Sequence, residues 1–236
     1  MITKENFIAR LNAGIPEIES FGERYGEKFF RYFELLIEYN EKMNLTAITD
    51  PDEVIKKHFA DSLLPHILGL IPTGTTVADV GSGAGFPGIP LAIVLPECEF
   101  LLMESIGKRV DFLNTVIEEL GLTNCRAEKI RAEEAGAKGS TYRESFDFAT
   151  ARAVSRLSIL SEYCLPLVKQ GGRMLALKSA AAPSEIEEAA NAISTLGGTN
   201  AKIVGTEERN VVVVEKSAPT PDKYPRRTGV PEKRPL

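Results

Sequence analysis

The sequence has few of the residues that form disulfides or bind metal ions. It contains three cysteines and two histidines in 236 residues. Cys98, Cys125 and Cys164 are far apart and form no CxxC pair, which excludes a disulfide framework. His58 and His66 lie next to none of them, so a zinc site would need ligands from distant parts of the chain. We therefore expect buried free thiols and no bound metal.

Long apolar segments are also missing. Charged residues or prolines interrupt the longest apolar stretches within about ten residues, whereas a membrane-spanning helix needs roughly twenty. Residues 1–6 show neither the basic region nor the apolar run that opens a secretory signal. We therefore expect no membrane contact and a cytoplasmic location.

Positive charge is scarce except near the C-terminus. The chain carries a formal net charge of -5, which argues against a protein that coats nucleic acid indiscriminately. Residues 217–236 differ, because five basic and two acidic side chains give them +3 and leave -8 on the other 216 residues. This distribution predicts contact with phosphate at one place only. Five prolines in the same segment exclude a regular element and predict an extended tail.

Helical periodicity dominates the first 70 residues. In residues 24–43, apolar side chains recur at spacings of three, four and seven with charges between them, which predicts an amphipathic helix. A shorter helix is expected before it, and another over residues 52–70. Segment 1–70 is therefore predicted to be a helical extension that packs on the main domain.

From residue 76 the pattern changes to short apolar runs separated by helical stretches. The runs span 77–80, 100–103, 125–130, 146–151, 174–177, 203–204 and 211–214. Alternating strands and helices predict an α/β fold whose sheet has a mostly parallel core. The last two runs are joined around Glu208 by too few residues for a parallel crossover, so we expect a terminal antiparallel hairpin. Segment 71–216 is thus predicted to be the catalytic domain, followed by the tail 217–236.

A glycine-rich loop follows the first predicted strand. The strand ending at Val80 continues into Gly81-Ser82-Gly83-Ala84-Gly85-Phe86-Pro87-Gly88, and a helix is expected directly after it. Glycines here let the backbone approach a ligand at a helix N-terminus, as in nucleotide-type sites. The predicted cofactor contacts are Gly81, Gly83 and Gly85. Residues 83–88 also satisfy GxGxxG, so a dinucleotide enzyme is an alternative.

Two acidic residues near the loop bear on the choice of cofactor. Asp79 lies two residues before Gly81, where a pyrophosphate would bring negative charge close to it. S-adenosylmethionine has no phosphate and presents an ammonium and a sulfonium, so a carboxylate here favours it. Glu104, 23 positions after Gly81, is predicted to accept hydrogen bonds from the ribose hydroxyls. The alternative is that both are ordinary strand-end carboxylates beside a tight turn.

Several short blocks occur together in one order along the chain. They are Asn44-Leu45-Thr46, His58-Phe59-Ala60-Asp61-Ser62, Asp79 to Pro90, Gly107-Lys108-Arg109 with Phe112-Leu113, Ala151-Arg152-Ala153, Ala176-Leu177-Lys178 and Pro225-Arg226-Arg227-Thr228-Gly229. With these blocks the chain resembles the glucose-inhibited division protein B family, also named ribosomal RNA small subunit methyltransferase G. They span nearly the whole sequence, which makes the resemblance more specific than any glycine motif.

The resemblance implies a Rossmann-like class I methyltransferase with a seven-stranded sheet and S-adenosylmethionine as cofactor. It further implies methylation of guanine nitrogen 7 in 16S ribosomal RNA, with that RNA or the small ribosomal subunit particle as partner. Cofactor contacts are implied at Gly81, Phe86, Ala132, Glu133 and Arg152.

Methylation at nitrogen 7 needs no general base, because this atom carries an in-plane lone pair and no proton. Catalysis then reduces to alignment of the reacting atoms. Arg152 after the run 146–151, and His58 with Asp61 three residues apart, are the candidate positioning residues. Arg152 is alternatively an arginine paired with a local acid, and His58 a structural histidine. Phe86 either lines the cofactor pocket or belongs to the core.

Basic residues late in the chain are the predicted RNA contacts. Lys178, Arg226 and Arg227 are chosen because cationic side chains match phosphate, and arginine forks also match the O6 and N7 acceptors of guanine. A solvated tail that contacts nothing is the alternative for the two arginines. Lys108 and Arg109 are expected to be surface charges on the polar face of a helix.

Other functions share the evidence of the loop. They are a methyltransferase for a small molecule or protein, a non-catalytic cofactor-binding module on ribosomal particles, and a dehydrogenase. They differ from the first interpretation in the substrate surface or in the cofactor. A monomer is the expected oligomeric state.

Overall fold

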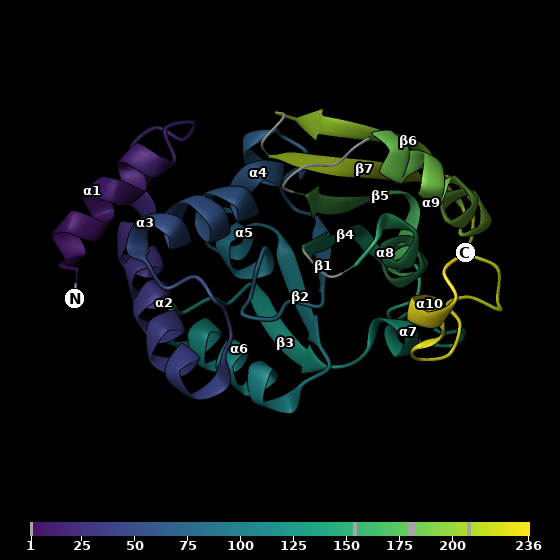
Figure 1. Cartoon of the computed structure of the whole chain (residues 1–236), viewed down its shortest axis with the longest axis horizontal. Coiled ribbons are helices and arrows are strands. Elements are labelled where there is room, and N and C mark those ends of the chain that lie inside the picture. Colours follow the sequence, from purple (N-terminus) through teal and green to yellow (C-terminus); the bar gives the residue numbers. More distant parts are fainter. Residues whose placement is uncertain (1, 153–154, 179–182, 207–208) are drawn as a thin grey trace.

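A computed structural model describes residues 2–152, 155–178, 183–206 and 209–236 (Figure 1). Within these residues, a seven-stranded sheet has the strand order β3-β2-β1-β4-β5-β7-β6. The strands are β1 Thr76–Val80, β2 Glu99–Glu104, β3 Cys125–Lys129, β4 Phe146–Arg152, β5 Val168–Lys178, β6 Gly198–Gly205 and β7 Asn210–Lys216. β1 to β5 pair in parallel, and β7 pairs antiparallel with β5 and β6. The mixed sheet and its terminal hairpin are confirmed, whereas Glu208 in the predicted turn and Ala153 lie outside the described residues.

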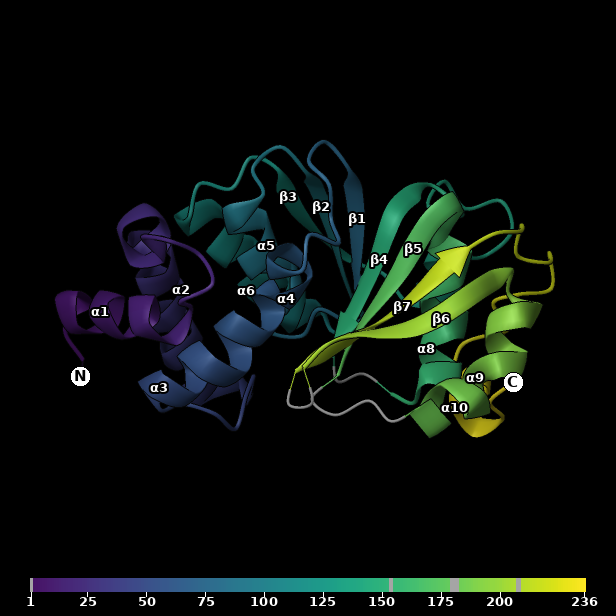
Figure 2. The same ribbon diagram turned by 90° about the horizontal axis from the view of Figure 1, so that it is seen from above.

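Helices cover both faces of the sheet (Figure 2). Those within the described ranges are α1 Lys4–Gly14, α2 Phe21–Met43, α3 Pro51–Val54, α4 Asp61–Ile67, α5 Gly88–Val94, α6 Gly107–Glu119, α7 Ala132–Ala135, α8 Leu157–Cys164, α9 Pro183–Thr195 and α10 Val230–Lys233, with a π-helical turn η1 Ile55–Ala60 and a 3-10 turn η2 Leu165–Leu167. Successive strand residues point to opposite faces and so enter two cores. Val77 packs with residues of α1, α2 and α4 to α6, whereas Ala78 and Val80 pack with residues of α7 to α9.

The N-terminal helices are part of the first of these cores. Phe7 of α1 stacks on Phe33 of α2 with ring centroids 5.0 Å apart, and Phe29 meets Phe59 edge-on at 4.9 Å. The helix predicted over residues 52–70 is observed as α3, η1 and α4 in succession. Tyr32 of α2 and Phe59 of η1 contact the ring of Phe86, so these helices reach the glycine loop.

The C-terminal segment does not form the predicted extended tail. Thr220, Tyr224 and Pro231 are buried, and Val230–Lys233 form the short helix α10 beside α8. The guanidinium of Arg143 donates to the carbonyl oxygens of Thr220 and Tyr224 at 2.6 and 2.7 Å. Arg143 thus satisfies carbonyl groups of the tail that no neighbouring strand of the described chain pairs with, and the proline-rich segment packs against the sheet domain. The yellow segment of Figure 1 shows this position next to α7.

Two features of the composition have a clear structural outcome. Cys98, Cys125 and Cys164 are buried and free, as predicted. Within the described part of the chain, no helix is long and apolar enough to cross a membrane. Among the same residues, no three His, Cys, Asp or Glu side chains gather in an arrangement that would hold a metal ion.

Candidate cofactor and substrate site

The loop after β1 brings backbone to the carboxyl edge of the sheet. Gly81, Gly83 and Gly85 adopt φ angles of 70°, 58° and 100°, a region that side chains other than glycine avoid. A Cβ atom at position 85 would lie 2.6 Å from the Tyr32 hydroxyl oxygen. The same hydroxyl donates to the Ala84 carbonyl at 2.5 Å and fixes the loop to α2. The predicted strand, loop and helix are therefore observed, and the N-terminal extension supports them.

Asp79 lies beneath this loop and lines neither of the two cavities described below. Its side chain has no exposed surface, and one carboxylate oxygen accepts from the backbone N–H of Gly88 at 3.1 Å. The other oxygen accepts from the Thr150 hydroxyl at 3.2 Å, and burial raises the pKa of Asp79 to about 6. The carboxylate thus holds the start of α5 against β4. This buried position gives Asp79 a structural role, and its predicted contact with the cofactor stays a prediction.

Glu104, at the end of β2, has the position predicted for a ribose ligand. Its oxygens accept from the backbone N–H groups of Gly83 and Ile106 at 3.1 and 2.9 Å. The Ser105 hydroxyl also donates to Oε1 at 3.4 Å, so the acceptor position left for a ribose hydroxyl lies on Oε2. Arg109 lies 3.7 Å from this carboxylate, and so Arg109 is more than the surface charge predicted for it. Lys108 is exposed.

A first cavity opens above Glu104. It is lined by Val80, Gly81, Met103, Glu104, Ser105, Ile130, Arg131, Ala132, Glu133, Tyr163 and Glu232. Ala132 and Glu133 follow β3, and the Glu133 carboxylate accepts from the backbone N–H of Gly229 at 3.1 Å. The lining residues that were not predicted as cofactor contacts are Val80, Met103, Ser105, Ile130, Arg131, Tyr163 and Glu232. Tyr163 donates to Glu232 at 3.3 Å, and Glu232 comes from α10, so only the packing of the tail reveals it.

The charge around the first cavity favours a cationic ligand. Glu104, Glu133 and Glu232 face it with Arg131 as the one basic lining residue in the described chain. A pyrophosphate would meet three carboxylates here, which disfavours the dehydrogenase. S-adenosylmethionine has a sulfonium, an ammonium and a ribose diol, and the residues present fit these groups. Carboxylates therefore favour S-adenosylmethionine in this cavity, and these carboxylates are Glu104, Glu133 and Glu232, with Asp79 not among them.

Arg152, at the end of β4, lies between the loop and a second cavity. Its guanidinium donates to the Lys57 carbonyl oxygen at 2.9 Å and lies 4.7 Å above the centre of the Phe86 ring. Within the described residues no carboxylate forms an ion pair with it, so the predicted alternative of a local acidic partner is not observed. Burial lowers the pKa of Arg152, and the charge of Asp61 partly opposes this. A largely buried guanidinium without a carboxylate partner among the described residues can bind an anionic or hydrogen-bond-accepting group of a ligand.

His58 supports Arg152 as a neutral base. The Nδ1 atom lies 3.2 Å from an Nη atom of Arg152 and 3.2 Å from the Lys57 carbonyl oxygen, and in the tautomer protonated at Nε2 it accepts from Arg152. Nε2 then donates to the Thr46 hydroxyl at 2.8 Å. Burial, followed by the charge of Arg152, lowers the pKa of His58 to about 4. Its ring stacks on Phe86 at 4.6 Å, which places Phe86 in a buried cluster beside the loop.

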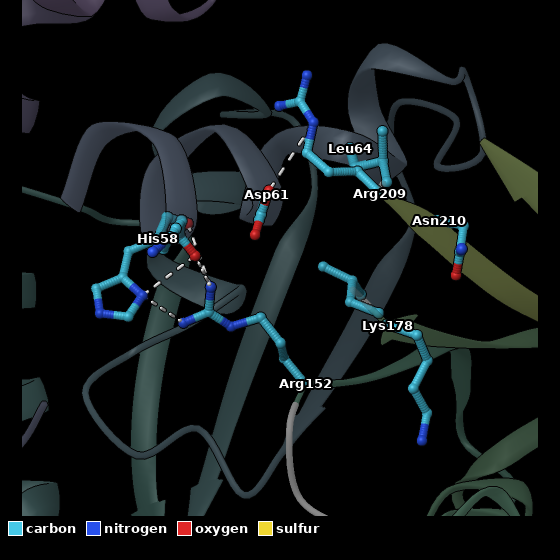
Figure 3. A pocket seen from close by; sticks show the side chains of 9 residues that line it. His58, Asp61, Leu64, Arg152, Lys178, Arg209 and Asn210 are labelled. Carbon is cyan, nitrogen blue, oxygen red and sulfur yellow. Dashed lines mark hydrogen bonds and ion pairs between the residues drawn. The ribbon is translucent and has the colours of Figure 1, made fainter. Parts of the chain in front are cut away.

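The second cavity is lined by α4, η1 and the ends of β4, β5 and β7 (Figure 3). Its lining residues are Lys57, His58, Asp61, Leu64, Arg152, Leu177, Lys178, Arg209 and Asn210. Lys178, a predicted RNA contact, forms an ion pair with Glu185 at 2.6 Å. The carboxylate of Asp61 lies 4.0 Å from Nε of Arg209, and burial raises the pKa of Asp61. The three predicted positioning residues thus lie together in this cavity.

The two predicted RNA contacts of the tail have different environments. Nε and Nη2 of Arg226 donate to Glu162, and the backbone N–H of Arg226 donates to the same carboxylate at 2.8 Å. The Glu162 side chain is only 1% exposed. Arg226 therefore anchors the tail to α8, and its contact with RNA stays a prediction. Arg227 is exposed, and its contact with RNA stays a prediction.

Comparison with known proteins identifies close relatives of the sequence. The family model described as rRNA small subunit methyltransferase G matches residues 26–213. The ribosomal RNA small subunit methyltransferase G of Lactococcus lactis subsp. cremoris strain MG1363 is 48% identical over 216 residues, which cover 89% of this chain and 90% of that protein. The protein of the same name from Brevibacillus brevis is 46% identical over 242 residues and covers 100% of both chains.

Solved structures show the same fold at low sequence identity. A putative S-adenosyl-L-methionine-dependent methyltransferase from Methanococcus maripaludis gives a TM-score of 0.56 at 12% identity and covers 79% of this chain and 92% of that one. A SAM-dependent methyltransferase from Aquifex aeolicus gives a TM-score of 0.54 at 18% identity, with 72% and 96% covered. The predicted Rossmann-like methyltransferase fold is confirmed.

Proposed function

The chain belongs to the rRNA small subunit methyltransferase G family, and on that basis we propose that it methylates guanine nitrogen 7 in small-subunit ribosomal RNA. S-adenosylmethionine is the cofactor. The observation that supports this function best is the first cavity, where a glycine loop and three carboxylates meet at the carboxyl edge of a methyltransferase sheet. A ribosomal RNA substrate also supports the predicted cytoplasmic location.

The cofactor has a natural orientation along this edge. Glu104 at the end of β2 suits the ribose, and Ala132 with Glu133 after β3 suits the adenine, in agreement with the predicted contacts. The glycine loop and Arg152 then lie on the side of the methionine group. Arg152 is available there because its guanidinium is held by backbone carbonyls and by His58, and not by a carboxylate of the described chain.

The reaction requires alignment and little acid–base chemistry. S-adenosylmethionine, when bound, would supply a methyl group on a positively charged sulfur, and transfer to the lone pair of nitrogen 7 would leave the electron pair of the C–S bond on sulfur. Positive charge would develop on the purine, so a carboxylate beside the purine would stabilise it. His58 is neutral at physiological pH and acts as a positioning residue for Arg152.

The test is transfer of a labelled methyl group. The protein is incubated with methyl-labelled S-adenosylmethionine and, separately, with small-subunit RNA, small ribosomal particles, large-subunit RNA or no RNA. We expect label in RNA of the small subunit only, with either the free RNA or the particle as the preferred substrate. Cofactor binding without transfer to any RNA would support the non-catalytic module, and label in a protein or small molecule would support another methyltransferase.

A further inference from the structure

The two cavities divide the carboxyl edge of the sheet between them. The first cavity takes residues from the ends of β1 and β2 and from the segment after β3. The second takes residues from the ends of β4 and β5 and from the start of β7, which runs antiparallel and so begins at the same edge. Arg152, which lines the second cavity, lies over the ring of Phe86 in the glycine loop, and Gly81 of the same loop lines the first cavity. If the cofactor occupies the first cavity, the second adjoins its methionine side.

A carboxylate and a guanidinium face each other across the second cavity. Figure 3 shows Asp61 extending from α4 toward Arg152, which rises from the end of β4. The two interact through space, yet no ion pair joins them in the described structure, and the nearest cation to Asp61 is Arg209 at 4.0 Å. Lys178 is already paired with Glu185. Asp61 is thus an acceptor that the protein leaves largely available to a ligand.

Asp61 and Arg152 together match the hydrogen-bonding groups of guanine. On the basis of the proposed function, we propose that the second cavity receives the target guanine and that Asp61 recognises its Watson–Crick edge by accepting from N1–H and the exocyclic N2 amine. The two oxygens of a carboxylate match these adjacent donors. Adenine and cytosine present a ring acceptor at the corresponding position, and uracil presents one donor between two carbonyls. Asp61 therefore selects guanine and repels the other bases.

This orientation also turns the reactive atom toward the cofactor. Nitrogen 7 belongs to the five-membered ring, on the side of the purine away from N1 and N2. A guanine held by Asp61 at one end presents nitrogen 7 at the other, toward the loop and Arg152. As positive charge develops on the purine, N1–H becomes a stronger donor, so the bond to Asp61 strengthens in the transition state. Asp61 is expected to affect kcat as well as substrate affinity.

Inosine provides the test, because it differs from guanosine only by the absence of the N2 amine. Once the methylated guanosine has been mapped, RNA is prepared with guanosine or inosine at that position. Methyl transfer is measured with the wild-type protein, with Asp61→Asn and Asp61→Ala, and with Asp111→Asn as a control on an exposed residue of α6. The affinity for S-adenosylmethionine is measured for each by calorimetry.

Inosine loses one hydrogen bond to the charged Asp61, so wild-type kcat/KM should be about ten- to a hundredfold lower on inosine RNA than on guanosine RNA. In both Asp61 variants the ratio of guanosine to inosine should approach one, while cofactor affinity stays at the wild-type value and Asp111→Asn behaves as wild type. Equal wild-type rates on the two RNAs would overturn the proposal even if no variant folds. Weaker binding of S-adenosylmethionine by the Asp61 variants, with an unchanged ratio of guanosine to inosine kcat/KM, would overturn the proposal and indicate that Asp61 contacts the cofactor ammonium. Absence of transfer to any guanosine-containing RNA would instead refute the proposed function.

Discussion

Replacement of Arg226 tests whether the tail is a built part of the protein. In Arg226→Ala, the carboxylate of Glu162 loses its guanidinium partner while it remains buried, since its side chain is 1% exposed. Loss of one partner of a buried ion pair costs about 3–5 kcal/mol. The Arg226 side chain is 23% exposed, so water partly replaces it, and we take the lower end, about 3 kcal/mol. A protein of this size should then unfold roughly 6–12 °C lower.

The assay is thermal and urea unfolding followed by circular dichroism, with Arg227→Ala as the matched control. The control should change the unfolding free energy by less than about 0.5 kcal/mol, because Arg227 is exposed. The double variant Arg226→Ala with Glu162→Gln should regain part of the loss, because it removes the stranded charge. If Arg226→Ala is as stable as Arg227→Ala, the tail is not anchored by this pair and the reasoning is refuted.

Three further predictions concern the two cavities and the tail. Glu104→Gln should raise the Kd for S-adenosylmethionine about tenfold or more in calorimetry, because an acceptor for the ribose becomes a donor; unchanged affinity would remove Glu104 from the site. The folded pKa of His58, about 4, lies below its ordinary 6.5, so its contribution to stability is present above pH 6.5 and lost as pH falls toward 4. As the pH falls over that range, the unfolding free energy of His58→Gln measured in urea should therefore decrease by about 3 kcal/mol less than that of the wild type. Parallel plots of unfolding free energy against pH would contradict the lowered pKa. Arg227→Glu should weaken RNA binding and reduce its salt dependence while cofactor affinity is unchanged, and an unaltered salt slope would exclude Arg227 from the RNA surface.

The sheet and the loop could be predicted because their signals are local. The strand ending at Val80, the glycines after it and the apolar face of the next helix are all consequences of short-range periodicity and backbone conformation. The closing hairpin followed from connection length alone. Glu104 could be placed because the end of a parallel strand two elements away must reach the same edge.

The tail could not be predicted, because its partners are distant in sequence. Arg143 and Glu162, which bind its backbone and Arg226, lie 64 or more residues before their contacts. Composition indicated only that prolines prevent a strand or long helix. The same packing brings Glu232 into the first cavity, so sequence patterns gave no signal for that residue or for Tyr163.

Asp79 has the position in the fold that was predicted, but it lines neither cavity. Its place at the end of β1 was evident, but its direction depends on the alternation of faces and on the hydroxyl of Thr150 in the neighbouring strand. The carboxylates that favour a cationic cofactor are Glu104, Glu133 and Glu232. Ala132 and Glu133 came only from the family resemblance, because neither spacing nor charge distinguishes them.

The central claim is methylation at nitrogen 7 of a guanine in small-subunit ribosomal RNA, and the position of the new methyl group tests it most directly. Borohydride reduces guanines methylated at nitrogen 7, aniline then cleaves the RNA at these nucleotides, and primer extension maps the break. We predict one new stop at a guanosine in RNA treated with wild-type protein and S-adenosylmethionine, and none with Glu104→Ala. Label in the RNA without such a stop, or a stop that does not depend on the protein, would contradict the account.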